Sequence, residues 1–105
     1  MAKRFIKWTR TAEIQYLGIL EYWVNRHKST TYARKLIEKV AERSKQIAEK
    51  PFIFKKADFK DTRVASLGNF SIFYQVADET IVITAFWDNR QDPEKLSRII
   101  LKDKS

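Results

Sequence analysis

The spacing of hydrophobic residues changes at Pro51. Before this proline, apolar residues recur every three or four positions, which is the period of an amphipathic helix. After it, apolar and polar residues alternate in short runs, which is the period of a half-buried strand. The chain therefore predicts helices in its first half and a sheet in its second.

The first half predicts a short strand followed by a helix. The bulky segment 5–9 is typical of a strand. Thr9 or Thr11 can cap the helix that follows, because a hydroxyl accepts an unpaired backbone N–H. Over 12–26 we expect a core-facing stripe of Ile14, Leu17, Leu20 and Val24, widened by Tyr16, Ile19 and Trp23. Gly18 weakens a helix by about 1 kcal/mol, so we expect it to mark a close helix contact.

A second helix follows the polar break at 27–31, with Ser29 or Thr30 as its cap. Its stripe toward the core is Ala33, Leu36, Ile37, Val40, Ala41, Ser44, Ile47 and Ala48. The residue before a proline disfavours helix, so this helix should end at about Glu49. Two helices with a short connection predict an antiparallel hairpin.

Three strands are predicted after the polar stretch 55–61, over 63–67, 70–76 and 80–87. Turns at Gly68-Asn69 and Asp78-Glu79 join them into a meander. In the third strand, simple alternation sets one face against the other: Ile81, Ile83, Ala85 and Trp87 against Val82, Thr84 and Phe86. Both faces are apolar, which predicts a central strand.

Pro93 can start a short closing helix through about Leu101. The expected fold is therefore α+β: an N-terminal strand, an antiparallel helix hairpin, a three-stranded antiparallel meander and a short C-terminal helix. Such an order favours helices gathered on one side of an antiparallel sheet. We expect residues 1–105 to form a single domain.

The net charge of the chain says more about its function than its overall composition does. Lys and Arg number 21 against 13 acidic residues, for a net charge of +8. This excess favours a polyanionic partner, although it can also serve solubility alone. With no cysteine, disulfides and thiolate metal sites are excluded. The most apolar run, 81–87, is far shorter than the roughly 20 residues that cross a bilayer, so we expect a cytoplasmic protein that does not bind membranes.

Several segments together resemble the RelE/ParE toxin superfamily, whose members are also called plasmid-stabilisation proteins. They are Thr9–Ala12 after the opening strand, the second helix ending at Pro51, Arg63, Leu67–Tyr74 around the first hairpin, and Phe86–Pro93. The resemblance spans most of the chain and implies a toxin of a type II toxin–antitoxin system, which inhibits growth and is neutralised by a cognate antitoxin. It requires no cofactor.

The resemblance implies one of two activities. ParE-like members poison DNA gyrase, whereas RelE-like members cut messenger RNA on the ribosome. The nucleases usually carry Arg where this chain has Ser71, and many carry His where it has Asp88. RNA cleavage needs a base and cations around the scissile phosphate, and a carboxylate there is electrostatically awkward. These departures favour action on gyrase, with a ribosome-dependent endoribonuclease and a non-toxic binding module as alternatives.

Two groups of residues are candidates for contacting the target: the basic run Lys55, Lys56, Lys60 and Arg63, and the pair Asn89 and Arg90. If the chain is a nuclease, the catalytic candidates are Arg63, Arg90 and Asp88. Each group also has a purely structural interpretation, as a solvated loop or as an Arg90 ion pair with Asp88 or Asp92. In the family fold, the two groups should lie near each other along one rim.

The remaining chemistry of the chain is sparse. His27 lies between the helices, where a surface or capping role is expected. A single histidine without cysteine offers no zinc-type site. Trp8, Trp23 and Trp87 are expected in the core or between helices, and an exposed one would indicate a groove for the antitoxin.

Overall fold

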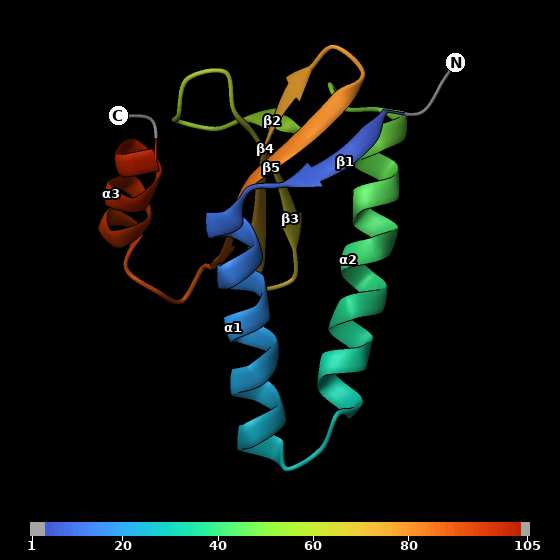
Figure 1. Cartoon of the computed structure of the whole chain (residues 1–105), viewed down its shortest axis with the longest axis vertical. Coiled ribbons are helices and arrows are strands. Elements are labelled where there is room, and N and C mark those ends of the chain that lie inside the picture. Colours follow the sequence, from blue (N-terminus) through green and yellow to red (C-terminus); the bar gives the residue numbers. More distant parts are fainter. Residues whose placement is uncertain (1–3, 104–105) are drawn as a thin grey trace.

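The computed structural model describes residues 4–103, with eight elements (Figure 1). In chain order they are β1 (Phe5–Trp8), α1 (Arg10–His27), α2 (Thr31–Glu49), β2 (Lys55–Lys56), β3 (Arg63–Leu67), β4 (Phe70–Ala77), β5 (Thr80–Asp88) and α3 (Pro93–Asp103). The predicted α+β order is confirmed. The antiparallel meander β3–β4–β5 has two additions, which make a five-stranded sheet of order β1-β5-β4-β3-β2.

The sequence pattern predicted β1 but not its pairing, and it missed β2. β1 pairs in parallel with β5, from Phe5 opposite Thr80 to Trp8 opposite Ile83. β2 is only Lys55 and Lys56, antiparallel to the start of β3. Two lysines carry no alternation, so periodicity could not reveal β2. The expected purely antiparallel sheet is thus wrong at β1, because the helix hairpin carries the chain across before the meander begins.

Hydroxyl side chains mark where both long helices begin. The backbone N–H of Ala12 donates to Thr9 Oγ1 at 3.1 Å, so α1 starts at Arg10. At α2 the N-cap residue is Thr30, whose side chain makes no capping hydrogen bond, and the preceding Ser29 Oγ accepts the N–H of Thr31 at 3.2 Å. The helix ends at Glu49, as Pro51 predicts. Each terminus therefore follows from local chemistry.

The predicted buried stripe of α1 is partly wrong. Ile14 and Leu17 are 58% and 53% exposed, whereas Ala12 is fully buried. Tyr16, Ile19 and Leu20 pack against the core from the other side of the helix. α1 is apolar around most of its circumference, so helical spacing alone could not choose the buried side. The fold leaves an apolar face of α1 open to solvent.

A bulge in β5 changes which residues share a face. Phe73 pairs with Ala85 and the next residue, Tyr74, pairs with Ile83, which leaves Thr84 as the extra residue. Ile81 and Ile83 therefore share the helix-hairpin face with Phe86, while Ala85 and Trp87 turn to the opposite face. The expected simple alternation along 81–87 is wrong beyond Thr84.

Both faces of the sheet are covered, which corrects the expectation of helices on one side only. The α1–α2 hairpin packs on one face through residues such as Leu36, Val40 and Ile47. α3 packs on the other face, where Leu96 and Ile100 contact the cluster that contains Trp87. Figure 1 shows α3 set apart from the hairpin. The apolar outer face of the meander is what α3 buries.

Two further contacts position the loops. The Tyr74 hydroxyl, at the centre of the sheet, donates to the Pro51 carbonyl at 2.6 Å and ties the end of α2 to β4. Gly68 has a φ of +59° in the β3–β4 turn, as that turn requires. A side chain at Gly18 would meet nothing within 4 Å, so the expected close contact there is absent. In the part of the chain that the structure describes, no helix has the length and apolarity needed to cross a membrane.

Candidate functional site

The end of β5 carries a tight ion pair between Asp88 and Arg90. Arg90 Nε and Nη2 donate to the two carboxylate oxygens at 2.9 and 2.8 Å, and the Arg90 N–H donates to Oδ1 at 3.0 Å. Hydrogen bonding from Arg90 is the main cause that lowers the pKa of Asp88. A carboxylate held in this way is a weak base at neutral pH. The structure therefore contains the ion pair between Arg90 and Asp88 that the sequence allowed as a purely structural role.

The side chains of Ser71 and Asn89 are hydrogen-bonded to each other in the same region. Ser71 is buried on β4, and its Oγ donates to Asn89 Oδ1 at 2.8 Å. The Asn89 N–H also donates to the Asn69 carbonyl at 2.8 Å, which ties the end of β5 to the β3–β4 turn. A larger cationic side chain at position 71 would displace this contact. Asn89 therefore holds the end of β5 against β4 and the β3–β4 turn.

Arg63 lies with Lys55 and Lys56 at the opposite end of the sheet, because Lys56 pairs with Arg63 across β2 and β3. Arg63 Nη1 donates to the carbonyls of Phe54 and Phe52 at 2.7 and 3.3 Å, and its guanidinium lies 5.2 Å from the Phe52 ring centre. These contacts hold the segment after α2. Lys55 and Lys56 are exposed beside it.

Lys60 lies in the loop between β2 and β3, and this loop is braced through its backbone. The Lys60 carbonyl accepts hydrogen bonds from the Thr62 hydroxyl at 2.9 Å and from Gln75 Nε2 at 3.4 Å. The loop thus belongs to the same end of the sheet as Arg63. The structure brings the four residues of the basic run together.

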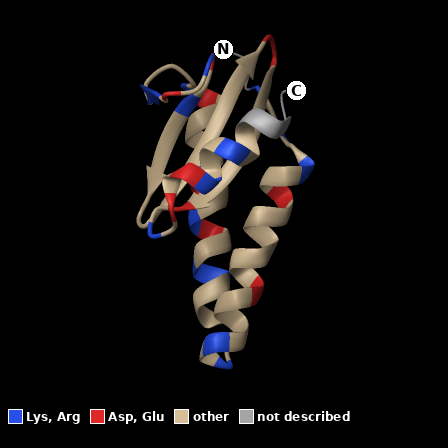
Figure 2. Cartoon of the chain, turned by 90° about the vertical axis from the view of Figure 1, so that its left-hand side faces the viewer, with Lys and Arg blue, Asp and Glu red and all other residues tan. Residues whose placement is uncertain are grey.

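The two predicted groups do not share one rim. Arg63 is paired with Tyr74, while Asp88 is paired with Phe70 at the other end of β4. Four residues of strand separate these positions, which is about 13 Å. Figure 2 shows Lys and Arg spread along the molecule and interleaved with Asp and Glu. The expected convergence of Arg90 with the basic run is therefore wrong, because they follow opposite strand ends.

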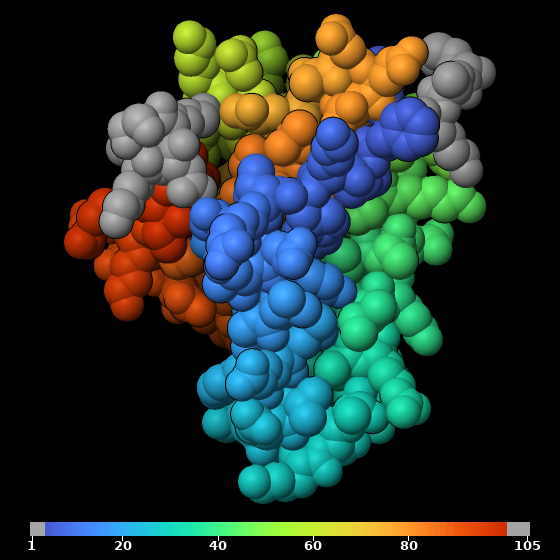
Figure 3. Space-filling view, in the orientation of Figure 1, coloured from blue at the N-terminus to red at the C-terminus, as the bar shows by residue number. Residues whose placement is uncertain are grey.

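A groove of about 800 Å³ lies between α1, the end of β5 and α3. In Figure 3, α1 (blue) and α3 (red) lie on either side of β5. Most of the lining is apolar, including Ile14, Ile19, Phe86, Trp87 and Ile99. The groove exists because β1 pairs with β5 only as far as Ile83, so the last residues of β5 have β4 on one side and no strand on the other.

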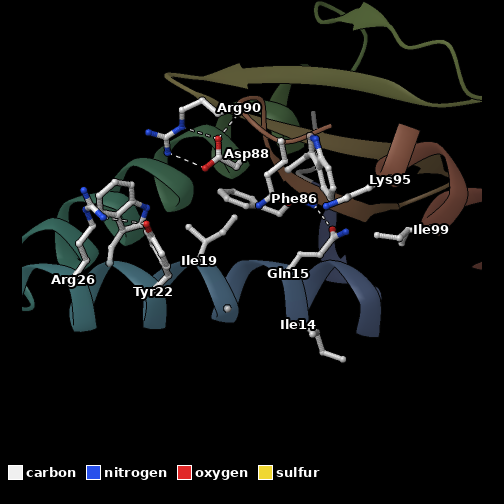
Figure 4. Close-up of a pocket in the computed structure, with 14 residues that line it drawn as sticks. Ile14, Gln15, Ile19, Tyr22, Arg26, Phe86, Asp88, Arg90, Lys95 and Ile99 are labelled. Atoms are coloured by element: carbon white, nitrogen blue, oxygen red, sulfur yellow. Dashed lines mark hydrogen bonds and ion pairs between the residues drawn. The ribbon is translucent and has the colours of Figure 1, made fainter. Parts of the chain in front are cut away.

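Gln15 closes the part of β5 that β1 does not cover. Its Oε1 accepts the Phe86 N–H at 2.9 Å, a bond that a longer β1 would otherwise supply (Figure 4). Gln15 Nε2 and Trp87 Nε1 are buried and have no hydrogen-bond partner among the residues that the structure describes. Both residues line the groove. Unpaired buried donors are uncommon in folded proteins and call for an explanation.

Aromatic and cationic side chains frame the other end of the groove. The Arg90 guanidinium lies 5.4 Å from the Trp23 ring centre. His27 stacks on the same ring, with the two ring centres 5.1 Å apart. The side chain of His27 is exposed, which agrees with the surface role expected for it. Arg26 donates to the Tyr22 hydroxyl at 3.4 Å. The groove thus joins an apolar floor to a rim that carries Arg26, Arg90 and Lys95 against one carboxylate, Asp88.

The groove is the part of the site that sequence reasoning missed. Two signals in the chain point to it: a glutamine between Ile14 and Tyr16 in the first half of α1, and apolar residues on more than one side of that helix. Of the three tryptophans, Trp23 and Trp87 line the groove and Trp8 does not. Among the described residues, no group of three His, Cys, Asp or Glu side chains is placed to hold a metal ion.

One family model matches the chain, and two solved structures share its fold. The family described as the ParE toxin of the type II toxin–antitoxin system parDE matches residues 6–93. No curated protein matches the chain. A structure of a chromosomal ParDE system from P. aeruginosa is 20% identical, with a TM-score of 0.68 over 80% of this chain and 94% of that one.

A second solved structure has the same fold. The RelBE2 toxin–antitoxin complex from Mycobacterium tuberculosis is also 20% identical, with a TM-score of 0.60 over 87% of this chain and 97% of that one. At such identities the likeness shows a shared fold. The family match covers most of the chain and includes both long helices and the whole meander. The chain therefore belongs to the ParE toxin family of type II toxin–antitoxin systems.

Proposed function

We propose that the chain arrests growth by acting on DNA gyrase without cutting nucleic acid, and that a cognate antitoxin neutralises it. The observation that carries the proposal is the Asp88–Arg90 pair. Both Asp88 oxygens are held by Arg90, and the pKa of Asp88 is lowered. The one residue that could replace a nuclease base is thereby a poor proton acceptor.

The other nuclease candidates support the same view. Arg63 is bonded to backbone carbonyls, and the strand register places it at the far end of the sheet from Arg90. A cleavage site needs a base and cations around a single phosphate. In this structure, Arg63 and Arg90 instead lie beside opposite ends of β4. We therefore assign Arg63 and Arg90 to holding loops and surfaces. Separately, we propose that the protein acts in the cytoplasm.

The antitoxin part of the proposal rests on the groove. On α1, the side chains of Ile14, Leu17 and Tyr22 are each more than half exposed, and neighbouring exposed apolar side chains favour a partner surface. The groove beside it combines apolar floor and cationic rim. Both solved relatives are toxin–antitoxin systems by their descriptions. A partner that covers this surface would silence the protein.

Induced expression tests the proposal in its simplest form. The chain alone should stop growth, and co-expression of the antitoxin should restore it. Normal growth without the antitoxin would favour the alternative of a non-toxic binding module on the same fold. Purified protein should then inhibit gyrase supercoiling in vitro, with heat-denatured protein as the control.

A ribosome-dependent endoribonuclease remains the second candidate, because Lys55 and Lys56 are exposed side by side next to Arg63. Such a cluster can hold RNA phosphates. Translating ribosomes with the protein should show no codon-positioned cuts. If cuts appear, and if they disappear in Lys55→Ala/Lys56→Ala but persist in Arg34→Ala on the exposed side of α2, the gyrase proposal is overturned.

A further inference from the structure

A second, shallower depression lies between α2 and the turn that joins β3 to β4. It consists of two hollows of about 200 and 350 Å³, whose linings share Lys39, Leu67 and Gly68. We call it the α2 cleft. It shares no lining residue with the groove beside α1, and none of the residues expected to contact a target lines it. The α2 cleft is therefore a separate surface.

One side of α2 supplies the α2 cleft with a row of cations. Lys35, Lys39 and Arg43 follow one another at four-residue intervals, so their side chains leave the same side of the helix. Eight residues of helix place the ends of the row about 12 Å apart. Lys35 and Lys39 are exposed, and within residues 4–103 neither is paired with a carboxylate. Their charges are available to an anion from outside.

The rest of the lining leaves this positive charge accessible. Arg43 is half-buried, and its guanidinium lies 5.7 Å from the Phe54 ring centre, which holds it at one end of the row. Glu42 is the one acidic residue of the lining. Across from the helix, an added Cβ at Gly68 would meet nothing within 4 Å, so the turn does not block the way to the lysines.

The apolar residues of the α2 cleft are already covered by the fold. Leu36, Leu67 and Phe70 are 4%, 8% and 3% exposed. Tyr32 packs against the Trp23 ring, with 4.8 Å between the ring centres. Protein partners place apolar or aromatic anchors at the centre of an interface, whereas protein–DNA interfaces are more polar and much more positively charged. The lining therefore favours a nucleic-acid backbone over a protein segment.

We propose that the α2 cleft binds the phosphate backbone of duplex DNA and thereby holds the protein on the substrate of gyrase. Duplex DNA carries one negative charge per about 1.7 Å of its axis, so a row of about 12 Å faces several phosphates at once. The net charge of +8 adds long-range attraction to the same polyanion. This inference rests on the proposed action on gyrase and adds DNA as a direct contact, one that reads no base sequence.

Salt-dependent binding to a short fluorescent DNA duplex, followed by anisotropy, tests the contact. Lys35→Ala/Lys39→Ala removes two charges inside the α2 cleft. As the matched control, Arg34→Ala/Lys45→Ala removes two exposed charges from another side of the same helix. We expect the lysine pair to reduce the slope of log K against log salt by about 1.8, and to weaken binding at about 50 mM salt by about tenfold or more. The control pair should stay within about threefold of wild type.

A variant of opposite sign and a folding control accompany this measurement. Glu42→Gln removes the one carboxylate of the lining, so it should strengthen DNA binding by about twofold or more; weaker binding would contradict the inference. All four substituted cations are exposed, and alanine favours helix. Thermal melts of both pairs should therefore match wild type, so that a loss of binding reports the contact and not unfolding.

Supercoiling assays connect the contact to gyrase. For equal inhibition, the lysine pair should need about tenfold more protein than wild type or the control pair. Losses of DNA affinity and of inhibition in the lysine pair alone support the inference. Equal losses in both pairs overturn it, and so does unchanged inhibition by the lysine pair. Tighter binding of wild type to polyglutamate or to an RNA duplex than to the DNA duplex, at the same salt, also overturns it.

The DNA contact and the proposed function fail separately. If wild-type protein inhibits gyrase but binds no duplex, the DNA contact is wrong and the action on gyrase stands. If it binds duplex DNA through Lys35 and Lys39 but does not inhibit gyrase, the action on gyrase is wrong and the DNA contact stands.

Discussion

The hydrogen bond from Tyr74 to Pro51 makes a quantitative prediction about stability. Tyr74 is fully buried, and its hydroxyl donates to the Pro51 carbonyl at 2.6 Å. Tyr74→Phe keeps the ring and leaves that carbonyl without its donor. An unpaired buried group costs about 1–3 kcal/mol. In a domain near this size, each kcal/mol lowers Tm by roughly 4–8 °C.

The pH dependence of the same variant checks the cause. Burial raises the pKa of Tyr74 to about 12, whereas an unfolded tyrosine has a pKa of about 10. A group whose pKa rises on folding stabilises the fold below its unfolded pKa, and the contribution is lost as pH rises toward the folded pKa. The advantage of wild type over Tyr74→Phe should therefore be constant near neutral pH and shrink above about pH 10.

Urea denaturation at several pH values measures both effects. Tyr32→Phe, which alters a partly exposed tyrosine on α2, serves as the control and should change stability little. A loss in Tyr74→Phe below about 0.5 kcal/mol at pH 7 would refute the reasoning. So would a difference from wild type that grows between pH 10 and 12.

Three further predictions follow from features of the site. Gly18→Ala should stabilise the chain by up to about 1 kcal/mol in urea denaturation, because nothing lies within 4 Å of the added carbon; a destabilised variant would contradict the open groove. Gly68→Ala should destabilise by about 1 kcal/mol in the same assay, since its φ is +59°. Asp88→Asn should lose stability at neutral pH, and its difference from wild type should begin to shrink as pH falls below about 4, because the pKa of Asp88 is lowered on folding; a difference that grows as pH falls from 4 would contradict the ion pair as its cause.

Local rules predicted the ends of the elements well. Thr9, Pro51 and Gly68 each act through their own backbone or hydroxyl, so their effects could be deduced without the fold. The parallel pairing of β1 with β5 joins residues about 75 positions apart, such as Phe5 and Thr80. No local pattern contains that information.

The candidate site was harder to predict than the fold. Arg63 and Arg90 were recognisable as cations that could bind a target, but only the strand register shows that they lie at opposite ends of β4. The open face of α1 was hidden because apolar residues surround most of that helix. Gln15 became meaningful only when its bond to Phe86 was known.

Because Thr84 is an extra residue in β5, apolar side chains of this one strand pack against both the helix hairpin and α3. Up to Ile83 the apolar side chains of β5 face the helix hairpin, and after the bulge Ala85 and Trp87 face α3. Deletion of Thr84 would remove the bulge and make Ile83 and Ala85 neighbours, so that plain alternation would return with Phe86 and Trp87 still on the faces that they now occupy. A strand that kept Thr84 but lost the bulge would instead exchange the orientations of Phe86 and Trp87, two side chains that line the groove. Alignments of related toxins can therefore place a one-residue gap at Thr84 without changing the face of any residue that follows, whereas a gap elsewhere in β5 would invert those faces.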